Sequence, residues 1–192
     1  MSAVADQDLL SPELTEDPFA YYAGLRASDP VHWAPASKAW LCSAIVALDR
    51  HPAERARLRA DPSLMKLAIE EVLRFEGPIK ILIRWVVQDH DRDGRLVRAG
   101  DRVFLVLQSA NRDEGTFASP DRFDIGRPAK PLHVGFGRGV HACLGAQLAR
   151  IEARVALPRI LDRLGDIRVL GDVTWRPNIS SRAVTGLRIS YA

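Results

Sequence analysis

The residues best suited to chemistry lie in one short stretch, 136–145, which contains a single cysteine, Cys143. Two spaced glycines, Gly137 and Gly139, precede it, and glycine permits positive φ angles and close approaches that other residues avoid. A helical pattern follows the cysteine, and the free N–H groups and dipole at a helix start favour a thiolate over a thiol. A thiolate held in such a loop suits a nucleophile or a metal ligand.

The same stretch also has an ordinary interpretation. A glycine-rich turn before a helix is common, and a free cysteine is most often a small buried apolar residue. What favours a functional site is the spacing of the whole set: Phe136, Gly137, Gly139, His141, Cys143 and Gly145.

This spacing resembles the heme-binding loop of the cytochrome P-450 family. The resemblance implies that the cofactor is heme b and that Cys143 is the axial ligand of its iron. Thiolate ligation donates electron density to iron and favours O–O cleavage. Phe136 and the glycines at 137, 139 and 145 would then shape the cofactor site around that sulfur.

A second set of residues lies on a predicted helix, 62–75, where Glu71 and Arg74 share an apolar face. Such pairs are usually solvated, but on an apolar stripe we expect burial, which requires further polar partners. Glu71 to Arg74 resembles the family's E-x-x-R motif, and Arg127 matches the arginine that joins it. The resemblance implies a structural network that braces the cysteine loop and retains heme without taking part in the chemistry.

Two further residues match positions that contact heme propionates in the family, Arg84 in a predicted strand and His141 two residues before the cysteine. Cationic or hydrogen-bonding groups suit carboxylates. The alternatives are a strand residue that faces solvent and an ordinary loop histidine.

Composition excludes several classes of protein. The 192 residues are 47% hydrophobic and 27% charged, which is typical of a soluble globular protein. The net charge of +3 comes without a Lys/Arg run, so we expect no nucleic-acid partner. No stretch is apolar for long enough to span a membrane, and the start lacks the features of a signal peptide. Two distant cysteines make no disulfide framework, so we expect a cytoplasmic protein.

The resemblance and the hydrophobic patterns together predict an α+β fold, a reduced P-450 architecture with a small mixed sheet beside proximal-side helices. We expect a flexible arm over 1–17 and one domain over 18–192. The predicted strands are 31–33 and 39–42 (a hairpin), 81–88 and 103–108, with short strands over 166–191. The predicted helices are 18–29, 44–50, 53–60, 62–75 and 144–164, the last of which Pro158 should kink or end.

Two apparent metal sites are rejected. Asp89 to Gly94 begins like a calcium loop, but the twelfth position is Gly100 instead of glutamate, so a β-hairpin turn at Asp93-Gly94 is expected. The spacing of His133, His141 and Cys143 is not a recognised zinc pattern.

The resemblance covers two blocks, 14–43 and 44–192, and it implies an internal deletion joined near Ser43-Ala44. The missing middle of the family holds a long distal helix with an acid–alcohol pair that handles protons. The resemblance therefore implies an oxidoreductase with impaired oxygen activation, a monooxygenase or a peroxide-driven peroxygenase acting on a small organic substrate. A ferredoxin-type protein would donate electrons, and a homodimer or second protein would cover the distal face. The alternative is an inactive remnant that binds heme or a partner.

Overall fold

The structure, a computed structural model, describes residues 35–191 of the chain. The chain divides into two compact units, Met1–Ala39 and Trp40–Ala192. In the first unit, the described residues are 35–39, the opening turn of one helix. The expected arm over 1–17 and the predicted helix over 18–29 lie outside the described residues.

The helices follow the expected order along the chain, with one addition, a four-residue helix where the sequence predicts the end of the strand 103–108. They are α3 (Pro35–Arg50), α4 (Pro52–Ala60), α5 (Met65–Phe75), α6 (Leu107–Ala110) and α7 (Ala146–Leu164), with 3-10 turns at Pro62–Leu64 and Gly139–His141. Proline at the first position starts α4 and the turn before α5, where a missing N–H costs nothing. The side chain of Asp61 caps that turn by accepting a hydrogen bond from the backbone N–H of Ser63 at 3.0 Å.

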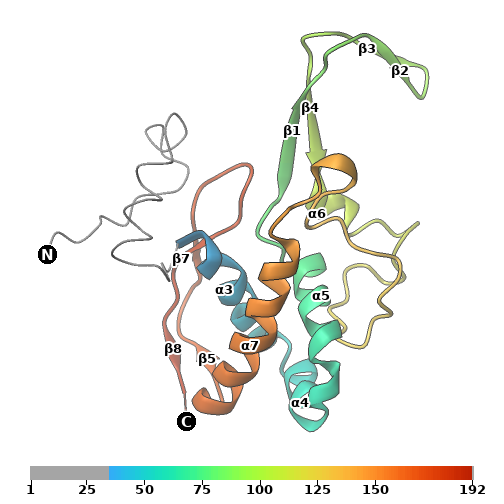
Figure 1. The fold of residues 1–192 in the computed structure, drawn as a ribbon. Helices are drawn as coiled ribbons and strands as arrows, with labels where there is room; N and C mark the ends of the chain where they lie inside the picture. Colours follow the sequence, from blue (N-terminus) through green and yellow to red (C-terminus); the bar gives the residue numbers. More distant parts are fainter. Residues whose placement is uncertain (1–34, 192) are drawn as a thin grey trace, which may run out of the picture. The chain divides into compact units, whose positions relative to one another are not determined.

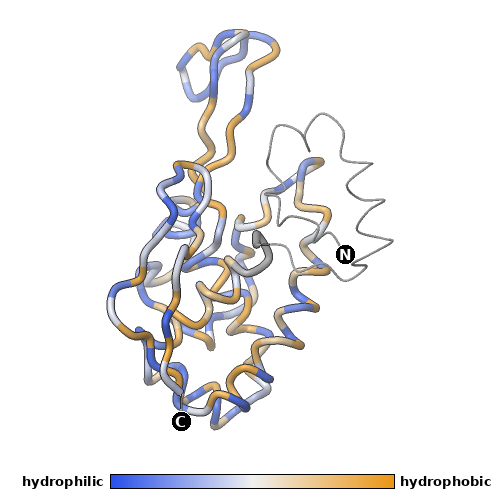
Figure 2. Tube along the Cα trace, turned by 90° about the vertical axis from the view of Figure 1, so that its left-hand side faces the viewer, coloured by the Kyte–Doolittle hydropathy of each residue, from blue (hydrophilic) through white to orange (hydrophobic). Residues whose placement is uncertain are grey.

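The strands form four antiparallel pairs among the described residues, in place of the one mixed sheet expected from the sequence. The pairs are β1 (Ile81–Trp85) with β4 (Arg102–Val106), β2 (His90–Arg92) with β3 (Arg95–Val97), β5 (Arg168–Val169) with β8 (Ile189–Ser190), and β6 (Thr174–Trp175) with β7 (Val184–Gly186). Strands β1 and β4 form a two-stranded arm that carries β2 and β3 at its far end (Figure 1). The tip of this arm is mostly hydrophilic, whereas the strands below it are largely hydrophobic (Figure 2).

The tip of the arm is the expected hairpin. Asp93 and Gly94 both have positive φ, 53° and 78°, as a two-residue type I′ turn requires. Among the described residues no three His, Cys, Asp or Glu side chains cluster closely enough to hold a metal ion.

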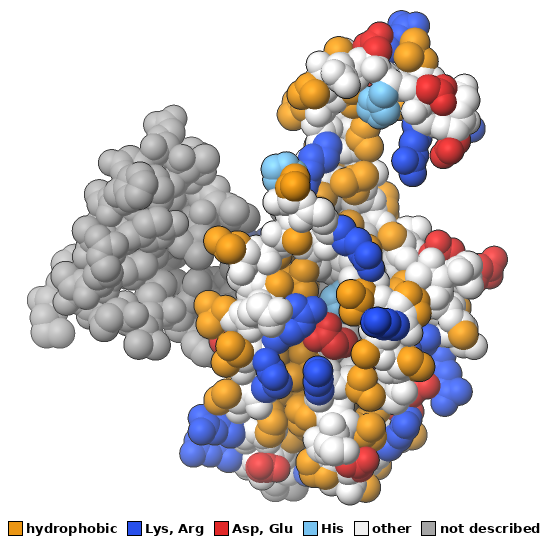
Figure 3. Space-filling view, turned by 45° about the vertical axis from the view of Figure 1, so that its right-hand side comes forward, with side chains coloured by type: hydrophobic (Ala, Val, Ile, Leu, Met, Phe, Trp, Pro, Cys, Tyr) orange, Lys and Arg blue, Asp and Glu red, His pale blue; other side chains and the backbone are white. Residues whose placement is uncertain are grey.

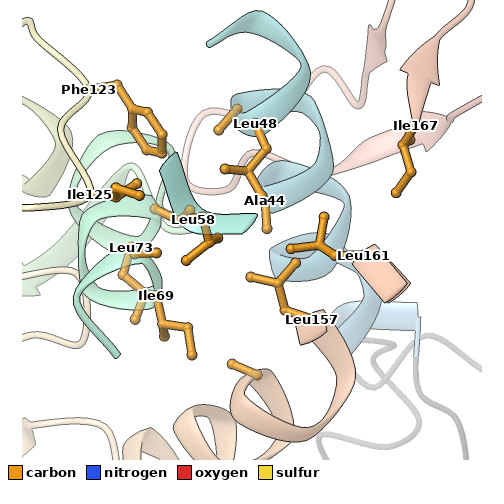
Figure 4. Packing of buried hydrophobic residues seen from close by; sticks show 14 residues of the cluster. Ala44, Leu48, Leu58, Ile69, Leu73, Phe123, Ile125, Leu157, Leu161 and Ile167 are labelled. Carbon is orange, nitrogen blue, oxygen red and sulfur yellow. The ribbon is translucent and has the colours of Figure 1, made fainter. Parts of the chain in front are cut away.

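The core lies between the helices and the long loop that follows α6 (Figure 4). Helices α5 and α7 pack side by side within it (Figure 1). Full burial of each large apolar side chain stabilises the fold by about 1.5–3 kcal/mol. The buried cluster comprises Ala44, Ala47, Leu48, Leu58, Ala68, Ile69, Val72, Leu73, Phe123, Ile125, Ala153, Leu157, Leu161 and Ile167. This packing fixes α5 and α7, the two helices that carry the polar groups of the site.

The predicted hairpin over residues 31–42 is wrong where it can be checked. Residues 39–42 belong to α3, which runs without interruption to Arg50, and residues 31–33 lie outside the described part. A four-residue apolar run has no distinctive period, and buried Ala44, Ala47 and Leu48 continue it at helical spacing. The suggested join at 43–44 therefore falls inside a helix, and strand β1 pairs with β4 alone among the described strands.

The long helix α7 does not end at Pro158, although proline removes one helical hydrogen bond. Leu157 and Leu161 on either side are buried in the core, and this packing carries the helix on to Leu164.

Candidate functional site

Cys143 lies between the 3-10 turn at Gly139–His141 and the start of α7. We call the segment 133–145, which contains it, the cysteine loop. Its N–H donates to the carbonyl of Phe136 at 2.8 Å, and its own carbonyl accepts from the N–H of Ala146 at 3.2 Å. The loop thus folds back on itself and leaves the Cys143 thiol exposed. Cys143 lies two residues before the helix N-cap, Gly145. This position is close to the helix start, at which the sequence analysis placed it.

Two of the three glycines in this loop are required by the backbone. Gly137 and Gly139 have φ angles of 70° and 72°, in the left-handed region that other residues rarely adopt. Gly145 has an ordinary φ of −79°, so its backbone would accept a side chain.

Glu71 contacts both Arg74 and Arg127. Arg74 donates from Nε and Nη2 to the two carboxylate oxygens of Glu71, both at 2.8 Å, and Arg127 donates from Nε to Glu71 Oε2 at 3.1 Å. The N–H of Asp124 donates to Glu71 Oε1 at 2.9 Å. Glu71 and Arg74 are 3% and 2% exposed, so the pair is buried instead of solvated.

The remaining N–H groups of the two arginines hold the loop after α6. They donate to backbone carbonyls, Arg74 to Asn111, Pro120 and Arg122, and Arg127 to Ala118, Ser119 and Arg122. These hydrogen bonds offset the free-energy cost of removing the buried charges from water. A planar guanidinium with several donors suits this task better than a lysine.

Asn111 links this network to the cysteine loop, and sequence reasoning gave it no such role. Its carbonyl accepts from Arg74, while its side-chain Oδ1 accepts from the N–H of Val134 at 2.8 Å. Asn111 is 2% exposed, and a buried amide with satisfied partners fixes the backbone that it bonds. Val134 in turn accepts from the N–H of Gly137 at 2.8 Å, within the glycine-rich stretch.

A second polar cluster, also missed from the sequence, is centred on Glu70, the residue of α5 that precedes Glu71. Glu70 accepts hydrogen bonds from Arg150 on α7 and from His133 in the cysteine loop. Burial raises the pKa of Glu70, but the hydrogen bonds from Arg150 and His133 and the charge of Arg150 outweigh that effect and lower its pKa to about 2. The carboxylate therefore stays ionised and binds both partners. Neither partner is near Glu70 in the sequence, so no local pattern could have indicated the cluster.

Arg84 and His141 line one cavity of about 470 Å³, together with Arg138 and apolar residues of β1, β4 and α6. Cys143 lines a neighbouring hollow of about 310 Å³, and Gly137 and Arg138 line both. Arg84, His141 and the thiol therefore lie around the same short loop segment, Gly137-Arg138.

The surface around the thiol is apolar and open. Val140 and Leu144, which flank the cysteine, are 96% and 101% exposed, and an apolar stripe continues along α7 through Leu148, Ile151 and Val155. Lys and Arg side chains gather on the face shown in Figure 3, with hydrophobic side chains among them.

These features fit a heme. A single exposed thiol suits a metal whose other ligands come from a macrocycle, and the described residues offer no cluster of protein ligands for a bare ion. The exposed apolar surface suits a flat hydrophobic ring, and the cavity lined by Arg84, Arg138 and His141 suits its acidic groups. No helix within residues 35–191 is long and apolar enough to cross a membrane.

Comparisons with known proteins agree with this geometry. The family model described as Cytochrome P450 matches residues 47–165. The cytochrome P450 monooxygenase PikC of Streptomyces venezuelae is 41% identical over 155 residues, which cover 79% of this chain and 37% of that protein. The biotin biosynthesis cytochrome P450 of Bacillus subtilis is 39% identical over 153 residues, which cover 79% of this chain and 38% of that protein. The chain thus spans less than two fifths of the length of these relatives.

Solved structures show the same fold. A crystal structure of P450BioI in complex with an acyl carrier protein carrying a hexadec-9Z-enoic acid superposes with a TM-score of 0.79 at 35% identity, covering 82% of this chain and 41% of that one. The hydroxylase HmtN of himastatin biosynthesis gives a TM-score of 0.78 at 35% identity, covering 83% and 43%. Because the family model matches more than half of its residues, from α3 to the end of α7, this chain belongs to the cytochrome P450 family.

Proposed function

We propose that this chain forms the thiolate side of a heme-binding site, with Cys143 as the ligand of the iron. The observation that carries the proposal is the exposed Cys143 thiol, which lies beside open apolar surface on a loop fixed by hydrogen bonds. Arg84 and His141 would hold the propionates of heme b, since both line the cavity next to that loop. Phe136, Gly137, Gly139 and Gly145 would shape the surface under the ring.

Glu71, Arg74 and Arg127 would act as a brace in this site. They bond the loop that follows α6 and, through Asn111, the start of the cysteine loop. Their role would be folding and heme retention, because their polar groups are engaged in the protein interior.

The heme would supply an iron centre for oxidation of a small organic substrate, as a monooxygenase or a peroxygenase. A ferredoxin-type protein would be the electron donor in the first case. Peroxide asks less of the protein, since its oxygen is already reduced. A heme-binding or partner-binding scaffold without turnover is the second candidate, favoured by the exposed apolar stripe along α7, which is typical of a contact surface.

A hemin titration tests the ligand assignment. Purified protein is loaded with hemin, reduced and exposed to carbon monoxide, and a red-shifted Soret band of thiolate ligation is expected. Cys143→Ala should abolish that band, whereas the matched control Cys42→Ala should keep it. A Cys143→Ala protein with the same band as wild type would overturn the assignment.

Turnover is measured separately. Hemin-loaded protein is given peroxide and a generic dye substrate, with free hemin at the same concentration as the control. Oxidation that exceeds free hemin and depends on Cys143 favours the enzyme. Binding of hemin without such oxidation favours the scaffold.

A further inference from the structure

A cluster of three side chains, which we call the Glu70 clamp, joins α5, α7 and the cysteine loop. It consists of Glu70, His133 and Arg150. Arg150 donates to Glu70 from Nε at 2.6 Å and from Nη2 at 2.8 Å, a bidentate pair. His133 Nε2 lies 3.1 Å from Glu70 Oε2. The His133 side chain is 6% exposed, so its ring is held within the protein.

The histidine arm of the clamp reaches the backbone of the cysteine loop. His133 Nδ1 accepts a hydrogen bond from the N–H of Gly135 at 3.0 Å. Because Nδ1 accepts, the ring carries its proton on Nε2 and donates it to Glu70, a tautomer assigned from the bonding pattern. His133 thus ties the carboxylate on α5 to the buried backbone of Gly135.

The arginine arm reaches the same segment from α7. The Arg150 guanidinium lies over the Phe136 ring, 4.7 Å from its centroid. The carbonyl of Phe136 accepts the N–H of Cys143 at 2.8 Å. Both arms of the clamp therefore end on adjacent residues, Gly135 and Phe136, and the second of these bonds the cysteine backbone directly.

We propose that Glu70, His133 and Arg150 are positioning residues that hold Gly135 and Phe136 in place and thereby fix the backbone of Cys143 in one conformation. As a role in heme ligation, this inference rests on the proposed function of Cys143. The neighbouring glutamate, Glu71, bonds the loop after α6, so the two consecutive carboxylates brace two different segments.

Paired variants separate the two arms. His133→Asn keeps an acceptor near Gly135 and loses the donor to Glu70, whereas His133→Gln keeps a donor to Glu70 and loses that acceptor. Arg150→Lys keeps the charge and loses the bidentate pair and the contact with Phe136. Glu70→Gln weakens both arms at once. Arg159→Ala, an exposed arginine elsewhere on α7, is the matched control.

The first measurement is amide hydrogen exchange of the heme-free protein over all 192 residues, followed by mass spectrometry. We expect peptides that contain the N–H groups of Gly135 and Cys143 to exchange about tenfold faster in Glu70→Gln and Arg150→Lys than in wild type. Peptides from the core of α5 should keep their protection, which shows that the variants are folded. Exchange of the loop within twofold of wild type in both variants would overturn the proposal.

The second measurement is the reduced carbon-monoxide spectrum of hemin-loaded protein. Clamp variants should show a smaller fraction of the red-shifted thiolate band at equal heme content, while Arg159→Ala matches wild type. An unchanged fraction in both Glu70→Gln and Arg150→Lys would overturn the clamp's role and leave the assignment of Cys143 standing. Faster loop exchange in a protein whose wild type shows no thiolate band would instead support the clamp and refute the heme proposal.

Discussion

At the residue scale, Glu71 is the polar side chain whose loss we expect to destabilise the fold most. It is almost fully buried and accepts hydrogen bonds from Arg74, Arg127 and the backbone of Asp124. Burying two charges costs several kcal/mol per ion, and only close partners offset that cost. Removal of the carboxylate charge would leave Arg74, which is 2% exposed, without its counter-charge.

We therefore expect Glu71→Gln to destabilise the protein by about 3–5 kcal/mol, the range seen when one partner of a buried pair is removed. Urea unfolding followed by circular dichroism measures the change. The exposed Glu152→Gln on α7 is the control and should shift the free energy of unfolding by less than about 0.5 kcal/mol. A loss below about 1 kcal/mol for Glu71→Gln would contradict the claim that this carboxylate compensates the buried charge of Arg74.

The lowered pKa of Glu70 makes the free energy of unfolding depend on pH in the acid range. Its pKa is lowered in the fold to about 2 from the ordinary 4.5, so the folded state binds this proton less readily than the unfolded state. The stabilisation is present above pH 4.5 and is lost as the pH falls towards 2. The groups that face Glu70 are Arg150 and His133, and Lys66 and Arg154 line the same hollow.

Wild type and Glu70→Gln should therefore differ most in free energy of unfolding above pH 5, and the difference should shrink between pH 4.5 and pH 2. Urea titrations at several pH values test this, with Glu152→Gln as a control whose difference stays flat. A difference that grows as the pH falls would have the wrong sign and would exclude the Glu70 clamp as a source of stability.

At the element scale, the sequence predicts well the turns and strands that are determined by neighbouring residues. The Asp93-Gly94 turn and its flanking strands follow from residues in direct succession. The segment 39–42 was misread because its helical period shows only when it is joined to the buried residues after it. The Glu70 clamp went unseen because its partners lie 63 and 80 residues away. The contact between Glu71 and Arg127 could be predicted only from the resemblance to the family, which matches the two residues separately.

Helix α7 carries a testable conflict between local propensity and packing. Pro158 lacks the N–H that a helix interior uses and crowds the preceding turn, yet α7 continues to Leu164 because Leu157 and Leu161 are buried. Pro158→Ala should restore the missing bond and stabilise the protein by about 1–3 kcal/mol. Thermal unfolding should show a higher midpoint, with Arg159→Ala as the neighbouring control. A lower midpoint would mean that Pro158 packs in a way alanine cannot replace.

At the scale of the whole molecule, the second unit combines a buried core with an exposed apolar stripe. The stripe begins beside the cysteine loop and consists of four residues at helical spacing, each at least 48% exposed: Leu144, Leu148, Ile151 and Val155. The opposite face of α7, with Ala153, Leu157 and Leu161, is buried in the core. Contiguous apolar surface of this kind favours association in water. The stripe should therefore govern self-association without contributing much to the stability of the fold.

We expect Leu148→Gln/Ile151→Gln to reduce concentration-dependent association of the heme-free protein, because the change removes exposed apolar surface and leaves the core intact. Analytical ultracentrifugation over a range of concentrations measures the association, and urea unfolding should show a change below about 1 kcal/mol. Val87→Gln, an 89% exposed residue next to β1, is the control for loss of an apolar side chain elsewhere and should leave the association as in wild type. Equal association in the stripe variant and the control would contradict the prediction, since the attraction would then come from another surface.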